Sequence, residues 1–244
     1  MKAAKPGSTS AGLRPAPMED LIWHDLESGG YAADLDFWAS LGPARVLELG
    51  AGAGRVSLML AVCGSQVSAV DLDEELLDAL RHRAGELGVE VETIAADART
   101  LDLGARFERV IAPAAFVQLL TRREDRVAMM ERAGRHLEPG GILWLAVHPD
   151  LDQALFDPAT PPGPTWVGPY ESRIEEARRD GELLTLRFRR RDRLADRTTT
   201  AEVVYADAGD LEAEAGEAGL HLRERVVLAE DDRYSESVIF GFGR

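Results

Sequence analysis

Apolar and polar residues follow two different rhythms along this chain. Up to residue 150, short apolar runs typical of buried strands alternate with segments whose apolar residues recur at the three- and four-residue spacing of helices. The expected strands are 45–50, 66–73, 89–97, 106–113 and 142–150, and the expected helices between them are 55–62, 74–87 and 123–137. This alternation predicts an α/β fold with a doubly wound, mostly parallel sheet.

The rhythm changes after Pro149. Residues 151–169 contain five prolines and are expected to form a loop. Segments 171–181, 182–191 and 198–205 alternate in the manner of strands, and we expect them to form an inserted antiparallel β cap. A helix is expected at 208–220 and a last pair of strands at 221–229 and 235–243.

These patterns predict four regions. Residues 1–17 are expected to be a disordered tail, and 18–150 to hold N-terminal lid helices, interrupted at Gly29-Gly30, and a ligand-binding core. The loop and β cap would occupy 151–205. The C-terminal helix and strand pair, at 206–244, would complete the core.

Three glycines, Gly50, Gly52 and Gly54, follow the first strand at alternate positions. A dinucleotide-binding loop would carry its third glycine where this chain has Arg55, and the Gly-Lys-Ser/Thr of a P-loop is missing. Glu48 precedes the loop, and its charge would repel a pyrophosphate but attract ammonium and sulfonium groups.

Two further acids follow the next strands, at the edge where ligands bind in such sheets. The carboxylate of Asp71 suits the two hydroxyls of a ribose. Asp97 could accept a hydrogen bond from an adenine amino group, with the Ala98 amide as a matching donor. Ribose, adenine, ammonium and sulfonium without phosphate describe S-adenosylmethionine.

The stretches "VLELGAGAGR", "VSAVDLDEELL", "IAADART", "FERVIAPAAFVQLL" and "HLEPGGILWLAV" resemble, in order and spacing, those of class I S-adenosylmethionine-dependent methyltransferases. The resemblance covers roughly residues 44–148, and the C-terminal strand pair also fits it. It implies a Rossmann-like fold with a seven-stranded sheet. It also implies cofactor contacts from a set of residues along the sheet edge: Gly50, Gly52, Asp71, Leu72, Asp97, Ala98 and the carbonyl of Ala112.

Several side chains are candidates for the acceptor side of the site. His148 closes the fifth strand and could act as a general base near neutral pH, or serve as a structural histidine. Tyr31 could touch the cofactor carboxylate or simply join the core. Phe116 and Gln118 would face the acceptor by analogy, or pack at a loop-helix junction. His24 is expected only as part of the lid helix.

Charge and composition narrow the partners. The net charge of −15 opposes binding to nucleic acid or to an anionic membrane. Cys63 is the single cysteine and the histidines are scattered, so neither a disulfide framework nor a metal site is expected, and the cytoplasm is the expected compartment. Nine arginines between residues 173 and 197 could attract an anionic acceptor or form the solvated face of a hairpin; we favour the second interpretation.

The sequence therefore predicts transfer of a methyl group from S-adenosylmethionine to N or O of a small-molecule acceptor. Methyl transfer depends mainly on alignment, so a general base is required only for a protonated or weakly nucleophilic acceptor. Two alternatives remain: a non-catalytic S-adenosylmethionine-binding or regulatory protein, and an NAD-dependent oxidoreductase, which Glu48 and Arg55 disfavour. The sequence leaves open whether the protein forms a homodimer.

Overall fold

A computed structural model describes residues 17–29, 31–114, 116–149, 164–204, 208–229 and 236–244 of the chain. The predicted tail and most of the predicted loop at 151–169 lie outside the described residues. Within the described part of the chain, no helix is long and apolar enough to cross a membrane.

The larger of two sheets has seven strands in the order β10-β11-β5-β4-β1-β2-β3. Neighbours from β3 to β5 are parallel, whereas β11 is antiparallel to both β5 and β10. The strand bounds are Arg45–Leu49 (β1), Gln66–Asp71 (β2), Val91–Ala95 (β3), Phe107–Ala112 (β4), Leu137–Val147 (β5), His221–Leu228 (β10) and Ser237–Gly243 (β11). The predicted Rossmann-like, mostly parallel sheet of seven strands is confirmed.

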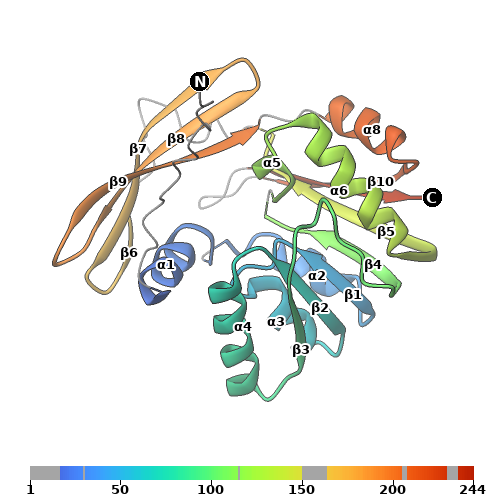
Figure 1. Cartoon of the computed structure of the whole chain (residues 1–244), viewed down its shortest axis with the longest axis horizontal. Coiled ribbons are helices and arrows are strands. Elements are labelled where there is room, and N and C mark those ends of the chain that lie inside the picture. The colour runs from blue at the N-terminus through green and yellow to red at the C-terminus, as the bar shows by residue number, and fades with distance from the viewer. Residues whose placement is uncertain (1–16, 30, 115, 150–163, 205–207, 230–235) are drawn as a thin grey trace, which may run out of the picture.

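Helices cover both faces of this sheet (Figure 1). Successive strand residues point to opposite faces, so Val110 packs into the core under α6 and α8 while Ile111 packs into the core under α2 and α3. Burial on both faces explains why the strands are continuous apolar runs. The helix bounds are Pro17–His24 (α1), Leu35–Ser40 (α2), Arg55–Val62 (α3), Glu74–Leu87 (α4), Phe116–Leu119 (α5), Arg123–Arg135 (α6) and Ala208–Glu217 (α8), with one π-helical turn at Asp25–Gly29 (η1).

The second sheet lies between β5 and α8 in the chain and has four antiparallel strands in the order β6-β7-β8-β9. Its strands are Thr165–Val167 (β6), Tyr170–Asp180 (β7), Leu183–Arg191 (β8) and Asp196–Val204 (β9). This β cap projects from the core on the side of α1 (Figure 1). The sequence interpretation placed only a loop at residues 151–169; β6 corrects this, because three of those residues pair with the start of β7.

The start of β5 also differs from the prediction. The strand was expected to begin at residue 142, after a break at Pro139-Gly140-Gly141, but it begins at Leu137, which pairs with Phe107. The register shifts before Arg109 pairs with Ile142. A Cβ on Gly141 would lie 2.9 Å from the backbone oxygen of Glu108, so glycine here permits close approach of β5 to β4. The glycines therefore form an irregularity within the strand.

Candidate functional site

A cavity of about 580 Å³ opens at the carboxyl ends of β1 to β4. Its walls contain most of the residues that the sequence singled out for the cofactor, and Phe116, which it singled out for the acceptor. Those residues are Glu48, Gly50, Gly52, Asp71, Leu72, Asp97, Ala98 and Phe116. Strand order brings them together, because the carboxyl ends of adjacent parallel strands meet at one edge of a sheet.

The glycine loop needs glycine for two reasons. Gly50, Gly52 and Gly54 have φ values of 70°, 53° and 92°, in the left-handed region that L side chains rarely adopt. In addition, a Cβ on Gly50 would lie 2.1 Å from the ring of Phe116, and one on Gly52 would lie 2.5 Å from Nε2 of His24. The rings of Phe116 and His24 therefore pack directly against the glycine loop.

Glu48 lies in β1, directly before the glycine loop, and is only 2% exposed. Its carboxylate accepts a short hydrogen bond from the Ser57 hydroxyl. Burial raises the pKa of Glu48 to about 7, against the opposing effects of Ser57 and of the nearby Arg55 guanidinium. Glu48 therefore changes between its neutral and its charged form near neutral pH.

Asp71 is fixed at the end of β2 by backbone donors. One carboxylate oxygen accepts from the Gly52 amide at 2.7 Å and the other from the Asp73 amide at 3.0 Å. Leu72, beside it, lines the cavity and is 70% exposed. The carboxylate thus links the glycine loop to the second strand and retains acceptor capacity, since each oxygen can take a further hydrogen bond.

Asp97 and Ala98 line the cavity beyond β3, where Arg99 and Asp125 join them. Arg99 donates to both oxygens of Asp97, from Nε at 2.9 and 3.0 Å and from Nη2 at 2.6 Å, and from Nη1 to Asp125 at 3.1 Å. These hydrogen bonds from Arg99 are the main cause of the lowered pKa of Asp97. The sequence interpretation had not included Arg99 or Asp125.

Four of the predicted residues do not line the cavity. Ala112 ends β4 in the core, and its successors Pro113 and Ala114 form the wall instead. Gln118 is fully buried, and its side chain forms hydrogen bonds with two backbone groups. It accepts a hydrogen bond from the His148 amide at 2.8 Å and donates one to the Val204 carbonyl at 3.1 Å. Gln118 thereby ties the end of β5 to the end of the β cap.

His148 and Tyr31 are the other two predicted site residues that do not line the cavity. Their rings meet edge to face, with centroids 5.1 Å apart, and the Tyr31 hydroxyl donates to Ser237 Oγ at 3.1 Å. Burial lowers the pKa of His148 despite a hydrogen bond to the backbone of Glu236. A neutral imidazole packed against Tyr31 is thus the form that the fold favours.

Arg55 and His24 are cavity residues that the sequence interpretation left without a role. Arg55 donates to both oxygens of the buried Asp34, at 2.5 and 2.9 Å, and to the Tyr31 carbonyl at 2.9 Å. His24 reaches the cavity from the end of α1, with a buried Nδ1 that has no hydrogen-bond partner. Arg55 ends the glycine motif, but its pairing with Asp34 and the contact of His24 with the loop are seen only in the tertiary structure.

The N-terminal segment 23–27, hereafter the strap, contacts three parts of the molecule. His24 rests on the glycine loop, and Asp25 pairs with Arg83 of α4 at 2.5 Å. On the other side, Glu27 accepts from Ser172 of the β cap at 2.6 Å and from Arg190 at 2.7 and 2.8 Å. The strap therefore connects the cavity with the β cap.

Apolar stacking adds to this contact between strap and cap. Trp23 is 4% exposed, lies edge to face with Tyr170 at 5.4 Å between centroids, and carries the Arg190 guanidinium over its ring at 5.6 Å. A buried aromatic ring and a charged pair thus hold the cap at the same place.

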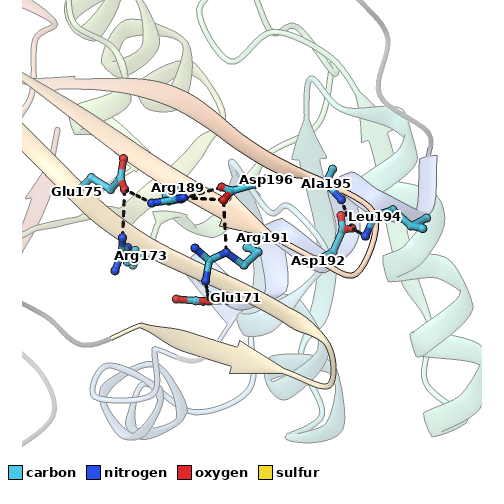
Figure 2. Close-up of polar contacts among 9 residues, drawn as sticks. All are labelled: Glu171, Arg173, Glu175, Arg189, Arg191, Asp192, Leu194, Ala195 and Asp196. Atoms are coloured by element: carbon cyan, nitrogen blue, oxygen red, sulfur yellow. Dashed lines mark hydrogen bonds and ion pairs between the residues drawn. The ribbon is translucent and has the colours of Figure 1, made fainter.

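Four arginines of the β cap pair with acids of the cap itself, namely Arg173, Arg187, Arg189 and Arg191. Figure 2 shows Arg189 paired with both oxygens of Asp196, at 2.6 and 2.7 Å, and with Glu175 at 3.2 Å. Arg191 contacts Glu171 and Asp196 in the same network. Leu184 and Leu186 of the same hairpin are buried, which confirms the predicted alternation of an apolar and a solvated face.

Among the described residues, no group of three or more His, Cys, Asp or Glu side chains is arranged to hold a metal ion. The cavity wall instead combines carboxylates, the arginines Arg55 and Arg99, His24, backbone amides and apolar side chains. Such a site suits a polar organic ligand with a flat aromatic part.

Comparison with known proteins agrees with this description. Residues 46–141 match a family model described as a methyltransferase domain. The chain is 34% identical over 130 residues to a cypemycin N-terminal methyltransferase from a Streptomyces species; 52% of this chain and 51% of that one are aligned. The chain thus spans about half the length of that curated relative.

Two solved structures share the fold over most of their length. The CcbJ methyltransferase from Streptomyces caelestis is 26% identical, with a TM-score of 0.71 over 88% of this chain and 97% of that one. An S-adenosylmethionine-dependent methyltransferase from Clostridium acetobutylicum has a TM-score of 0.74 at 15% identity, over 93% and 97% of the two chains. The core of this protein therefore has the fold of S-adenosylmethionine-dependent methyltransferases, and residues 46–141 within it match a methyltransferase domain.

Proposed function

We propose that this protein transfers the methyl group of S-adenosylmethionine to a nitrogen or oxygen atom of a small-molecule acceptor. The observation that carries this proposal is the single cavity wall that unites Glu48, the glycine loop, Asp71 and Asp97. Carboxylates beside a glycine loop suit a ligand with an ammonium and a sulfonium, and oppose the pyrophosphate of a dinucleotide. The proposal thus favours S-adenosylmethionine over NAD.

We assign the parts of the cofactor to the cavity as follows. The methionyl part lies on Gly50 and Gly52 with its ammonium toward Glu48, the ribose hydroxyls bind Asp71, and the adenine lies between Leu72 and the Asp97–Ala98 edge. The Ala112 carbonyl and Tyr31 remain candidate contacts of the methionyl end, which would require local movement. These roles rest on the resemblance and on the residues that line the cavity.

The reaction needs few groups from the protein. A lone pair on the acceptor attacks the methyl carbon in line, the bond from that carbon to sulfur breaks, and the electron pair stays on sulfur. The acceptor then loses a proton, to solvent or to a base. Alignment supplies most of the acceleration, and His148 is the candidate base only if the acceptor is protonated or weakly nucleophilic.

We further propose a small, non-polyanionic acceptor held between the strap, Phe116 and the β cap. The net charge of −15 supports this, because it repels nucleic acid and anionic membranes. Four of the cap's nine arginines already pair with acids of the cap, which reduces the positive charge available to an anionic acceptor. The cytoplasm is the compartment that we propose, in keeping with a single cysteine.

Titration calorimetry with S-adenosylmethionine, S-adenosylhomocysteine and NAD tests the cofactor. We expect the first two to bind and NAD not to bind. Asp71→Ala should weaken binding by about 1–3 kcal/mol, the range for leaving polar partners unpaired. The control Glu131→Ala, at an exposed position on α6, should bind as the wild type does. Unchanged affinity in the Asp71 variant would remove that residue from the site.

A methylation screen over metabolite extracts tests the acceptor. Radioactive methyl-labelled cofactor should label small molecules that separate from protein and nucleic acid on a sizing column. Label found only in added tRNA or protein would overturn the proposed acceptor class. Cofactor binding without labelling in any extract would favour the non-catalytic alternative.

A further inference from the structure

The cluster Asp97, Arg99 and Asp125 lies at one end of the cavity, where β3 ends. Arg99 lies between the two carboxylates, with Nε and Nη2 on Asp97 and Nη1 on Asp125 of α6. The Arg99 backbone amide adds a fourth kind of contact, since it donates to Asp97 at 2.8 Å. All three side chains line the cavity.

This arrangement leaves Asp97 little rotational freedom. A carboxylate held by a guanidinium at both oxygens has a defined plane, because the fork geometry of arginine matches it. Asp125 holds the opposite side of the guanidinium, so the position of Arg99 is fixed by two elements rather than by its own flexible chain. The ionised form of Asp97 is favoured by the same contacts.

We propose that Arg99 is a positioning residue that fixes Asp97 as a hydrogen-bond acceptor and so makes the cavity select a purine with an exocyclic amino group. This inference rests on the proposed function, which places the cofactor's adenine at this end. It adds a residue that touches no part of the cofactor in the proposed arrangement and acts through Asp97 and the neighbouring Ala98 amide.

The chemistry of purines explains the selection. Adenine offers an amino donor and a ring-nitrogen acceptor on one edge, which complement a carboxylate and a backbone N–H. In a deaminated purine the same edge carries an oxo group and a ring N–H. The oxo oxygen would then face the Asp97 carboxylate, and two N–H groups would face each other. A carboxylate that cannot rotate or take up a proton enforces this difference.

The test compares S-adenosylhomocysteine with its deaminated analogue, whose purine carries an oxo group in place of the amino group. Dissociation constants for both are measured by titration calorimetry at pH 7.5 on the wild type, Arg99→Gln and Arg99→Lys. We expect the wild type to prefer the amino form. The preference should fall roughly tenfold in Arg99→Gln, the order expected from losing hydrogen bonds to a charged group, and recover in part in Arg99→Lys.

Arg123→Ala is the matched control. Arg123 also pairs with a carboxylate through two nitrogens, at 2.5 and 2.9 Å from Glu217, but lies on the exterior of α6. It should leave the preference unchanged. Equal weakening of both ligands in Arg99→Gln, or an unchanged preference, would overturn the inference. Failure of the wild type to bind S-adenosylhomocysteine at all would instead overturn the proposed function.

Discussion

Replacing Glu48 by glutamine should change how the stability of this protein depends on pH. An unfolded chain loses the Glu48 proton near 4.5, whereas burial holds the folded pKa at about 7. Between these values the folded state binds more protons than the unfolded state, so the free energy of unfolding falls as pH rises through this window and is constant above it. The difference from 4.5 to about 7 corresponds to roughly 3 kcal/mol.

The Glu48→Gln variant keeps a similar shape and can still pair with Ser57, but it has no proton to lose. We therefore expect its stability relative to the wild type to rise by about 2–3 kcal/mol between pH 5 and pH 8. Urea denaturation followed by circular dichroism at several pH values measures this. Asp34 and Asp71, which also act on Glu48, are present in both proteins and cancel in the difference.

Glu92→Gln is the control for this experiment. Glu92 also accepts a hydrogen bond from a serine, Ser68 at 2.5 Å, but its side chain is exposed. Its stability difference from the wild type should be nearly constant over the same pH range. A constant difference for Glu48→Gln as well would refute the argument that burial controls this carboxyl group.

Three other changes test further features. Glu214→Ala should lower the free energy of unfolding by about 3–5 kcal/mol, because it leaves the buried Arg126 without its partner; Glu217→Ala, which breaks an exposed pair, should have a far smaller effect in the same urea titration. His148→Phe should change turnover by less than about tenfold, since the ring does not line the cavity; a fall of about 10²–10⁴ in steady-state rates would identify a general base. Glu27→Gln should loosen the β cap, seen as faster proteolysis within residues 164–204, and an unchanged digestion pattern would show that the Glu27 contacts do not hold the cap.

Much of the fold followed from local patterns in the sequence. The parallel core was predictable because each strand is an apolar run buried on both faces, and the glycine loop because three left-handed residues need glycine. β6 was not predictable from the sequence, because an edge strand of three residues among prolines is too short to show a periodicity of its own. The early start of β5 was missed because Pro139 and two glycines resemble a turn, while their pairing depends on the distant strand β4.

The candidate site was predictable only in its first layer. Acids that directly follow strands share one edge by topology, so Asp71 and Asp97 could be placed from sequence. Their partners could not: Arg99 and Asp125 meet across 26 residues. His148 looked suited to proton transfer because it ends a strand at the right edge, but the direction of its side chain toward Tyr31 depends on packing that no local pattern encodes.

The strap has a consequence for how two ligands would affect each other's binding here. A ligand that settles on the glycine loop must displace the His24 ring from Gly52, and Trp23 and Glu27, which hold the cap, are within three residues of that ring. Ligand binding at the glycine loop and the position of the β cap are then energetically coupled. By thermodynamic reciprocity, whatever factor the first ligand applies to the affinity of the second, the second applies to the affinity of the first.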